Sequence, residues 1–505
     1  MFALDFKDAP NPEVFDYRPE RYILHTHGMT GGAHFAHVLE NVTGPTQAVQ
    51  IRTWYPSIGA IRATLSGTFH AMWIARAIPR GMLCRFKVGF AGMPYSEWAD
   101  CGIYQFKGLS GARNNWVMEF GDYFSFLQSR PAIGTPADLF PNAGVEKELA
   151  SAYNPASSVG LRFGSTSDRE TFTRDSGGNG LVYAAPSGSD PFYIKFSGES
   201  GSTLNVVDAD VIDTTRVALS SGAKIRALGY VNGRPTDILE KLLFKTKTTA
   251  TSVGTMPDDS NMMLSYDDHT VDRSDWRREA EFFKTFGDFN ADFIAAQPLD
   301  NPWAAISDFF GAFGIWLVMR QGRLSFRFAT DCSSTTAEEL RTVGEITDVD
   351  IGGVEGQQLY HPDAREQLTT VIIRDGENTE SDGKATTLPA QARFTHPVGE
   401  FIYGNSSNKA DARDNLKRRI LKWYTRIPME LSLTLTGWRW ASLVPGDVVR
   451  VTSEYVPDLV GHFTFRDVPT IRDRVFMVTS IAPDFGNFTT SVKLAQLPDK
   501  YNPYQ

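Results

Sequence analysis

The sequence predicts an α+β fold that is mainly β: two small β-barrel domains, a helix-containing middle region and an inserted loop-rich lobe. Short segments in which apolar and polar residues alternate dominate both ends of the chain, and Gly or Pro separates them. Helical spacing of apolar residues is concentrated in the middle of the chain. The 43 glycines and the aromatic content of 12% suit a β-rich fold with many tight turns.

Size and composition limit the class of protein. With 505 residues and an apolar content of 42%, the chain can hold two to four domains with buried cores. A formal net charge of -9 disfavours a dedicated nucleic-acid binder, which is usually basic. The three cysteines lack a C-x-x-C spacing and suit a reducing compartment, although a Cys84–Cys101 disulfide stays open. We expect neither a signal peptide nor a membrane-spanning segment, because no apolar run approaches about 20 residues.

Composition and period divide the chain into five regions. They are an N-terminal arm (1–40), a first β-barrel (41–130), an inserted peripheral lobe (131–201), a middle α+β domain (202–340) and a second β-barrel (341–505). The strands expected in the first barrel are 49–54, 61–68, 83–90, 102–107 and 116–120. The lobe is rich in Gly, Ser, Ala, Pro and Asp, which suits a peripheral excursion.

The middle region contains the most regular patterns. In 300–328, Asn301 and Pro302 begin a short helix that ends at Gly311, and Asp308 lies on its polar face. A β-hairpin follows, with a strand at 315–319 that is buried on both faces and a turn at Gln321 and Gly322. Two further helices are expected, one at 235–244 with Thr236 as its N-cap and one around 275–286.

The second β-rich region contains a polar loop at 376–387 and a helix at 408–426. That helix places Ala412, Leu416, Ile420, Trp423 and Tyr424 along one side and basic residues on the other. Strands follow it to the C-terminus, beginning with 430–435.

Two parts of the chain have the same layout. Pro79-Arg80-Gly81 precedes one strand, and a strand, turn and strand follow at 103–120. Pro445-Gly446-Asp447 precedes another, and a strand, turn and strand follow at 475–494. The match is one of order and period. Either the chain contains two similar barrels, or two unrelated antiparallel hairpins look alike. If the repeat is real, three chains present six similar surfaces.

The order of these pieces resembles the baseplate-hub and tail-tip hub proteins of long-tailed bacteriophages, gene transfer agents and contractile injection systems. The similarity rests on DILEKLLF, on WAAISDFFGAFGIWLVMRQGRLSF and on the C-terminal LVPGDVVRV and FMVTSIAPDFGNFTTSVKLAQLP. It covers about 235–330 and 410–498 and, more loosely, 45–127. The motifs are individually common, and it is their order that carries the resemblance.

The resemblance implies a structural virion protein at the distal end of the tail, made in the host cytoplasm. It implies a homotrimeric ring that joins the hexameric tail tube to a central fibre or spike. The tape measure protein and the distal tail proteins are further implied partners. The resemblance further implies that genomic DNA passes through the lumen without specific binding, for which an acidic lining is suitable because like charges repel phosphate. No cofactor and no catalytic site are implied.

Four histidines within thirteen positions, His25, His27, His34 and His37, have ligand-like spacing. Neutral imidazoles in an H-x-H pair can bind transition metals. The only acidic residue close by is Glu40, and no cysteine is near, so we interpret the cluster as surface or interface polarity and keep these residues as weak metal candidates. A trimer axis would complete such a site.

The other chemical candidates are weaker than their structural alternatives. The bases of 409–426 suit a solvated helix face better than nucleic acid. The acidic segments 256–261 and 267–268 lack the order of a calcium loop. Glu97 and Asp100 beside Trp98 are weak as a glycosidase pair. No GxSxG, HExxH, P-loop or GxGxxG pattern occurs, so we expect no enzyme.

A carbohydrate-binding adhesin or receptor-binding protein is the alternative function. Trp423, Trp438 and Trp440 would be its sugar platform, although core or interface aromatics suit their apolar surroundings better. A cell-wall hydrolase is a third hypothesis without support from a motif.

Overall fold

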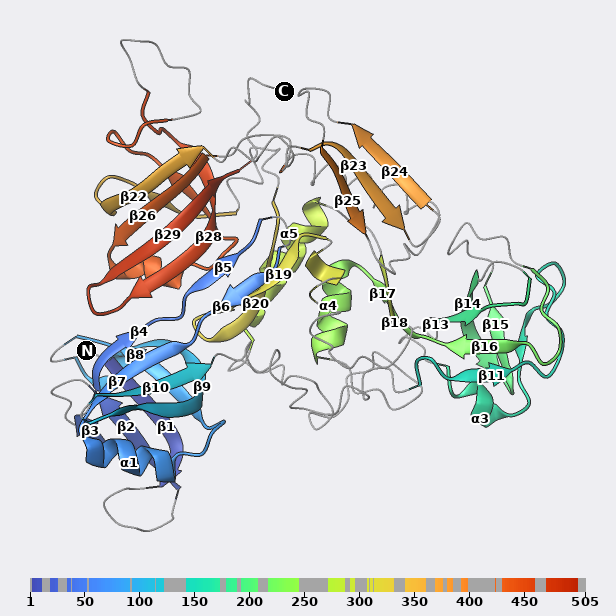
Figure 1. The fold of residues 1–505 in the computed structure, drawn as a ribbon, viewed down its shortest axis with the longest axis horizontal. Helices are drawn as coiled ribbons and strands as arrows, with labels where there is room; N and C mark the ends of the chain where they lie inside the picture. Colours follow the sequence, from blue (N-terminus) through green and yellow to red (C-terminus); the bar gives the residue numbers. More distant parts are fainter. Residues whose placement is uncertain are drawn as a thin grey trace.

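The computed structural model describes the chain in separate stretches. They are residues 2–10, 19–25, 34–37, 39–51, 54–90, 93–113, 115–121, 142–172, 179–188, 192–207, 217–244, 271–286, 291–295, 307, 309–311, 313–330, 341–359, 368–375, 379–384, 392–397, 423, 429–458 and 469–497. Two half-barrel sheets, one N-terminal and one C-terminal, lie next to each other, with a central α+β unit beside them and an inserted sheet on the far side (Figure 1). The predicted class, α+β and mainly β, is confirmed.

The N-terminal half-barrel is an eight-stranded sheet in the order β3-β2-β1-β8-β9-β10-β7-β4. Its strands are β1 (Phe2–Pro10), β2 (Pro19–His25), β3 (His34–His37), β4 (Leu39–Thr43), β7 (Ile61–Ser66), β8 (Leu83–Val88), β9 (Ala99–Ala112) and β10 (Asn115–Gly121). The strands predicted in 61–68, 83–90, 102–107 and 116–120 are confirmed. Helix α1 (Thr68–Ala77), which the sequence analysis missed, packs on the sheet through Ala71 and Ile74. A single 3-10 turn, η1 (Tyr95–Glu97), precedes β9.

The strand predicted at 49–54 is wrong. Val49 ends β5 (Gln47–Val49), and the described residues 50, 51 and 54 lie in the bend that leads to β6 (Pro56–Ile58), the partner strand of a short hairpin. The backbone N–H of Trp54 donates to the Gln50 carbonyl at 2.7 Å, and Trp54 has a positive φ of 53°. The Trp54 ring stacks on Trp316 at 5.1 Å between centroids, so burial of this side chain favours a bend over an extended strand.

The inserted sheet has its own core and has six strands in the order β11-β16-β13-β14-β15-β12. The strands are β11 (Glu146–Glu148), β12 (Gly160–Arg162), β13 (Asn179–Ala184), β14 (Phe192–Ser200), β15 (Thr203–Val206) and β16 (Lys224–Ala227), and a short helix α3 (Thr166–Arg169) flanks them. Strands β15 and β16, which follow residue 201, complete the sheet. Phe163, Phe172 and Phe196 are buried in its core.

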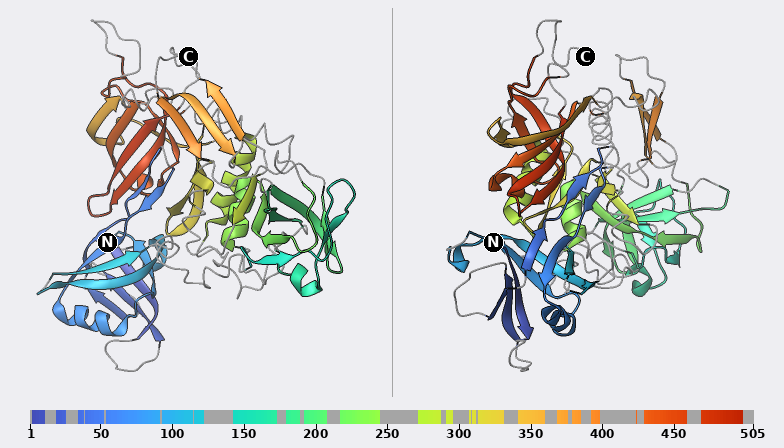
Figure 2. Two further views of the ribbon diagram at one scale, coloured as in Figure 1. Left: turned by 45° about the vertical axis from the view of Figure 1, so that its right-hand side comes forward. Right: turned by 60° about the vertical axis from the view of Figure 1, so that its left-hand side comes forward.

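The described part of the central unit includes two long helices, one strand pair with these helices between its strands in the sequence, and one β-hairpin (Figure 2). Its elements are α4 (Pro235–Phe244), α5 (Arg273–Phe286), β17 (Gly229–Gly233), β18 (Ala291–Ala295), β19 (Ile315–Arg320) and β20 (Arg323–Phe328). The helices predicted at 235–244 and around 275–286 and the β19–β20 hairpin are confirmed, and β19 is buried on both faces. Of the helix predicted to end at Gly311, the described residues 307 and 309–311 are helical. Thr236 as an N-cap is wrong, because the helix already begins at Pro235. Among the described helices, none has the length and apolar character needed to cross a bilayer.

The C-terminal half-barrel is a six-stranded path in the order β21-β27-β28-β29-β26-β22, and β5 pairs with β28 beside that path. The strands are β21 (Thr342–Ile346), β22 (Ile351–Leu359), β26 (Met429–Thr436), β27 (Val448–Val451), β28 (Arg474–Asp484) and β29 (Thr489–Gln496), and the 3-10 helix η4 (Trp438–Ser442) lies between β26 and β27. The predicted strand at 430–435 is confirmed.

A separate three-stranded sheet lies between β22 and β26 in the sequence. It consists of β23 (Leu368–Asp375), β24 (Thr379–Lys384) and β25 (Ala392–Pro397), in the order β24-β23-β25. The polar loop predicted at 376–387 is therefore wrong over 379–384. These residues pair antiparallel with β23, because backbone hydrogen bonding to a neighbouring strand suits polar residues as well as apolar ones.

The two half-barrels contain the same five-stranded module. Module 1 consists of β4, β7, β8, β9 and β10, and module 2 of β22, β26, β27, β28 and β29. In each, the first strand lies at one edge and the order across the sheet is third, fourth, fifth, second, first. In each, a glycine with positive φ follows the second strand, a helical segment comes next, and a second glycine with positive φ precedes the third strand. These glycines are Gly67 and Gly81 in module 1 and Gly437 and Gly446 in module 2.

The repeat extends to individual backbone hydrogen bonds. Gly81 N donates to Phe106 O at 2.8 Å, and Gly446 N donates to Val478 O at 2.7 Å. In the fourth strand of each module, the residue directly after this carbonyl is extra and has no partner in the fifth strand, Lys107 in β9 and Thr479 in β28. The first strands also share a bulge, at Glu40 and at Gly352. Bulges at the same register positions are unlikely to coincide in unrelated hairpins, so the repeat is real.

Candidate assembly site: the buried junction of the two modules

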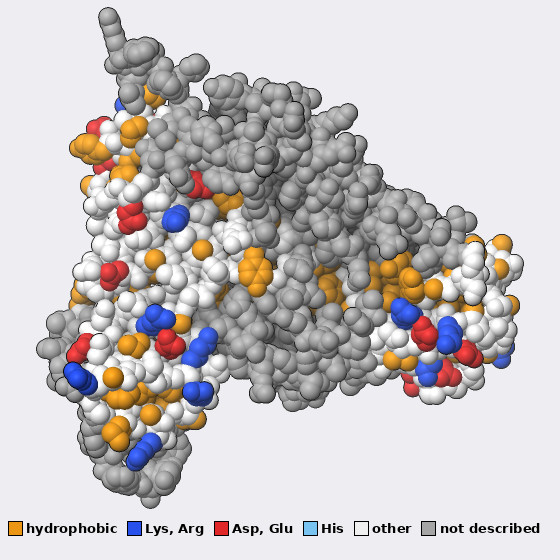
Figure 3. Space-filling model, viewed as in Figure 1, with side chains coloured by type: hydrophobic (Ala, Val, Ile, Leu, Met, Phe, Trp, Pro, Cys, Tyr) orange, Lys and Arg blue, Asp and Glu red, His pale blue; other side chains and the backbone are white. Residues whose placement is uncertain are grey.

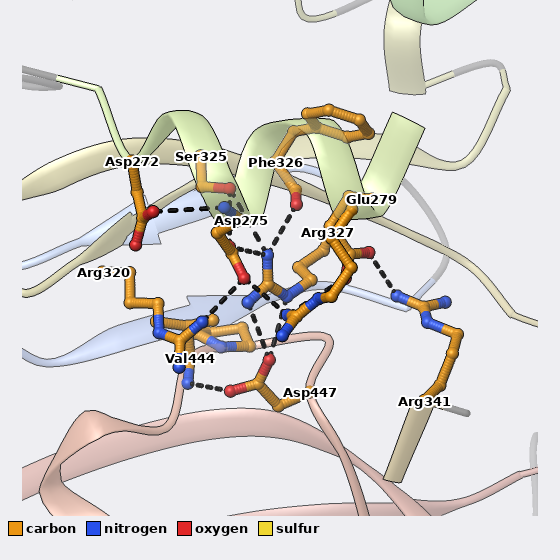
Figure 4. Close-up of polar contacts among 12 residues, drawn as sticks. Asp272, Asp275, Glu279, Arg320, Ser325, Phe326, Arg327, Arg341, Val444 and Asp447 are labelled. Carbon is orange, nitrogen blue, oxygen red and sulfur yellow. Dashed lines mark hydrogen bonds and ion pairs between the residues drawn. The ribbon is translucent and has the colours of Figure 1, made fainter. Parts of the chain in front are cut away.

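The second strand of the central hairpin carries a buried charge. In an alternating strand, Ser325 and Arg327 would face solvent, yet both have no exposed surface. Arg327 Nη1 donates to Asp275 Oδ2 at 2.6 Å, and Arg327 Nε donates to Asp447 Oδ1 at 2.9 Å. Asp275 comes from α5, and Asp447 comes from the turn before β27 of module 2, so one guanidinium joins three parts of the chain (Figure 4).

Asp275 is held ionised by its surroundings. It accepts hydrogen bonds from Ser325 Oγ at 2.7 Å and from Arg320 Nη1 at 2.6 Å. Burial alone would raise the pKa of Asp275, but the charge of Arg327 and the hydrogen bonds from Arg327 and Ser325 outweigh it and lower this pKa to about 2. Asp275 lies in the first turn of α5. Its backbone N–H donates to Asp272 Oδ1 at 3.1 Å, so Asp272 caps the N-terminus of this helix.

Arg327 stays charged although it is completely buried. Burial opposes its charge, but the carboxylates of Asp447, Glu279 and Asp275 raise the pKa of Arg327 above its ordinary value. Next to it, Arg341 Nη2 donates to Glu279 Oε2 at 2.6 Å, and the Arg341 guanidinium lies 4.2 Å from the Phe328 ring centroid. The buried ion pairs of Arg327 thus join α5, β20 and the turn before β27.

The Pro445-Gly446-Asp447 turn is shaped to fit over the hairpin. Asp447 Oδ2 accepts the Val444 N–H at 3.0 Å, which fixes the turn internally. Trp316 Nε1 donates to the Pro445 carbonyl at 3.1 Å. A Cβ atom on Gly446 would lie 2.6 Å from Arg327 Cβ, and Gly446 has a φ of +101°. Only glycine allows this turn to lie directly on β19 and β20.

The turn of the same hairpin touches module 1. Gln321 and Gly322 both have positive φ, which suits the two central residues of a two-residue turn. A Cβ atom on Gly322 would lie 2.3 Å from Ile103 N, and one on Gly102 would lie 2.3 Å from Gln321 O. The hairpin thus contacts module 2 along its strand and module 1 at its tip, which fixes the two modules to one support.

The modules also meet each other directly. The β28–β29 hairpin of module 2 places Phe485 in the core cluster of module 1, where its ring lies 5.2 Å from Phe86. A Cβ atom on Gly44 would lie 2.5 Å from the Phe485 ring. At the surface, Phe488 stacks on Phe90 at 5.9 Å between centroids.

A cavity of about 170 Å³ lies where modules 1 and 2 and the central hairpin meet. Tyr104 lines it from module 1, Met319 from the hairpin and Ile481 from module 2. Cys101 also lines this cavity, while Cys84 is buried in module 1, and the disulfide left open by the sequence is not formed between them.

The structure separates the three tryptophans of the predicted sugar platform. Trp423 is buried in the central cluster against Trp54, Trp440 is buried in module 2, and Trp438 lies at the junction against Phe485. They are core and interface aromatics, as their apolar surroundings indicate. Trp98 is buried as well, and its Nε1 donates to Met93 O, so it is a structural residue beside Glu97.

For the histidine candidates, the structure describes only the backbone of His25, His34 and His37. β2 and β3 are parallel neighbours in which His25 and His37 are register partners and His34 faces Tyr22. His27 lies outside the described residues, and no side-chain geometry is described for the other three. Asp308, 256–261, 267–268 and the helix predicted at 408–426, except Trp423, also lie outside them.

The described face of the two modules carries charges of both signs interspersed with apolar side chains (Figure 3). On the inserted sheet, acidic and basic side chains pair, as in Lys147 with Asp168 at 2.8 Å and Arg226 with Glu146 at 3.0 Å. Such pairing gives no single-sign field on this face for steering a charged partner.

Comparisons with known proteins give weak likenesses. No protein-family model matches the chain. No curated protein matches it either. The 43 kDa tail protein of prophage MuSo2 from Shewanella oneidensis is 10% identical over 92% of this chain and 98% of its own, with a TM-score of 0.36. A tail protein from Neisseria meningitidis MC58 is 10% identical over 98% of this chain and 96% of its own, with a TM-score of 0.36.

A third structure, of the virion of a native gene transfer agent particle, contains a chain that is 14% identical over 70% of this chain and 77% of its own, with a TM-score of 0.30. TM-scores this low do not show that the chains share a fold.

Proposed function

We propose that the protein is a structural component of a bacteriophage-like tail, in which three copies form a ring-shaped hub at the distal end. The ring would join a hexameric tail tube to a central fibre or spike and surround the DNA channel. The observation that carries the proposal is the repeat of one module within the chain, down to matching bulges and hydrogen bonds.

The repeat matters because of symmetry. A hexameric tube ends in six equal surfaces, whereas a fibre or spike commonly has three-fold symmetry. A chain with two copies of one module can present six similar surfaces as a trimer, and it can present three equal sets of its other regions. The resemblance in the order of sequence segments, described above, indicates the same role.

A hub also needs modules held rigidly relative to each other. The Arg327 cluster, the Gly446 turn and the Phe485 contact join both modules to the central hairpin. The proposal assigns this buried chemistry a mechanical role and assigns the protein no catalytic role. The inserted sheet, which lies away from the modules, is available for a fibre or for the host surface (Figure 2).

The test is symmetry classification of the purified protein by negative-stain electron microscopy, alone and with a hexameric tail-tube protein. The proposal expects threefold rings with a central channel that cap the end of the tube. Monomers that leave the tube end free would contradict it. Saccharide binding by the monomer, measured by calorimetry, would then favour the adhesin alternative.

A further inference from the structure

The contact between modules within the chain has a direction. Module 2 inserts the tip of its β28–β29 hairpin, and module 1 receives it. The receiving side consists of β4 and the end of β8, with Gly44 and Phe86 against Phe485 and with Phe90 against Phe488. Val42 of β4 lies in the same cluster as Phe485 and is fully buried.

The strand register identifies the receiving side of module 2. The pair Phe120–Ile61 of module 1 occupies the same place as the pair Leu494–Leu431 of module 2. Counting along the strands from these pairs aligns the remaining residues of the two modules. The equivalents obtained in this way are Val354 for Val42, Gly353 for Asn41 and Val451 for Phe86. Four residues beyond Phe86 and Val451 come two exposed aromatic residues, Phe90 and Tyr455.

The receiving side of module 2 is open within the chain. Val354 is 49% exposed, although its equivalent Val42 has no exposed surface, and Tyr455 is 82% exposed. Val349 is 86% exposed, and the segments of Val349 and Tyr455 are joined where the Asp348 carboxylate accepts the Glu454 N–H at 2.9 Å. A Cβ atom on Gly353 or Gly356 would meet nothing within 4 Å, in contrast to Gly44. We call these residues, 349–356 and 454–455, the open rim.

The open rim faces away from module 1. Strand β22 lies on the side of module 2 opposite to the module 1 junction in Figure 1. Apolar side chains this exposed are frequent at interfaces with other chains. A second copy of the chain is the expected partner, because its module 1 contains a hairpin equivalent to the one that module 2 inserts into module 1.

Module 1 has the inserting hairpin that corresponds to β28–β29. It is the β9–β10 hairpin, whose tip residues Gly111, Ala112 and Arg113 are exposed. The tip is held in place: Thr68 Oγ1 and Trp116 Nε1 donate to the Arg113 carbonyl at 2.7 and 2.8 Å. Met72 of α1, one helical turn after Thr68, is half exposed.

The two surfaces are complementary in charge as well as in register. The tip carries Arg113, and the open rim carries Glu355 and Glu454, all of them exposed. The helical segment before the third strand carries a half-exposed apolar residue, Met72, in module 1, and in module 2 it carries Trp438, whose ring lies against Phe488. Electrostatic complementarity of this kind favours one docking direction.

We propose that the β9–β10 tip of one copy of this chain docks on the open rim of module 2 in the next copy, repeating between chains the contact made within the chain. The interface is heterologous, and copies joined in this way close into a ring when the rotation between them divides a full turn. The inference rests on the proposed function for the number of copies, three, and supplies the residues of the interface.

Cysteine cross-linking tests the pairing. In a chain with Cys101→Ser and Cys332→Ser, the double variant Arg113→Cys and Tyr455→Cys should form intermolecular disulfides on mild oxidation. Denaturing gels would show bands up to a closed trimer. Each single variant should stay monomeric on the gel, because a head-to-tail contact does not bring a residue next to its own copy. The pair Phe90→Cys and Phe488→Cys is the control, since it samples the same contact within one chain.

Charge reversal gives a second readout in solution. Arg113→Glu and Glu454→Arg should each weaken assembly about tenfold or more in sedimentation experiments, and combining them should restore it. Exposed positions such as these tolerate substitution, and unchanged thermal unfolding would confirm folding.

The outcomes separate this inference from the proposed function. Rings without the Arg113–Tyr455 cross-link would overturn the interface and leave the hub role standing. Cross-linked open chains of unlimited length would support the interface and contradict the trimeric hub. A chain that stays monomeric at all concentrations, without the cross-link, would overturn both.

Discussion

Arg327 and Asp447 are 120 positions apart in the sequence, yet Arg327 Nε donates to Asp447 Oδ1 at 2.9 Å, and both side chains are buried. The same guanidinium contacts Asp275 on its other side. A buried cation between two buried carboxylates is stable only as a complete set, because removal of one partner leaves an uncompensated charge in a region of low polarity.

We therefore expect Asp447→Ala to destabilise the contact between module 2 and the central hairpin by about 3–5 kcal/mol. The measurement is native-state hydrogen exchange of the β19, β20 and β27 amides, because a chain with several folded regions does not unfold in one step. Glu119→Ala is the matched control. Glu119 pairs with Arg62 on the surface, and its loss should cost less than about 1 kcal/mol. Equal losses of protection in the two variants would show that the Arg327–Asp447 pair does not stabilise this contact.

Asp275 gives a prediction for pH. Its pKa lies at about 2 in the folded chain, below the ordinary value of 3.8. A carboxyl group with a lowered pKa adds stability above its unfolded pKa, and this stability is lost as the pH falls towards the folded value. The shift corresponds to about 2 kcal/mol, which should disappear between about pH 5 and about pH 2.

The comparison is between the native chain and Asp275→Asn, by native-state hydrogen exchange of the α5 and β20 amides, corrected for the intrinsic exchange rate at each pH. The native chain should lose about 2 kcal/mol more than the variant over this pH range. Parallel pH profiles would show that Asp275 is not the group responsible.

The central hairpin shows how far the sequence predicts this fold. Its turn at Gln321 and Gly322 and the double burial of β19 follow from an apolar run beside a turn dipeptide. The burial of Ser325 and Arg327 does not, because an alternating strand with polar residues at every second position is also the pattern of a half-exposed strand. The buried charge of Arg327 is compensated by two carboxylates that are distant in the sequence, one 52 positions away and one 120 positions away.

The junction was predictable only in outline. Matching layouts around Gly81 and Gly446 indicated a repeat, but the register that makes it real is a property of strand pairing. Pro445-Gly446-Asp447 is a common turn sequence, and its role comes from Arg327 beneath it. A sequence signal for α1 existed, in the helical spacing of Ala71 and Ile74 after Gly67, and the turn-rich surroundings obscured it.

The contact between the hairpin tip and β9 yields a prediction for Gly322. Alanine there would need a positive φ, which costs about 1–2 kcal/mol, and its Cβ would lie 2.3 Å from Ile103 N. We expect Gly322→Ala to cost more than this strain alone and to lower the protection of β9 amides. Gly188→Ala is the control, since Gly188 has a similar φ of +83° with nothing within 4 Å of the added Cβ. It should show the strain alone, and equal costs in both variants would mean that the close approach does not matter.

Phe485 gives the last prediction, because it is the residue through which module 2 enters the core of module 1. Its ring is 5% exposed and lies against Phe86 and Trp438. Phe485→Ala should cost about 3–5 kcal/mol, the usual range for removing a buried aromatic ring. The loss should appear in hydrogen exchange as lower protection of β4 and β8 in module 1, although the substitution lies in module 2. Phe163→Ala is the control, since Phe163 is equally buried in the core of the inserted sheet and should lower protection there alone. If Phe485→Ala lowered protection only within module 2, the two modules would be joined by the central hairpin and not by each other. The hairpin contact would then be no template for the contact between chains.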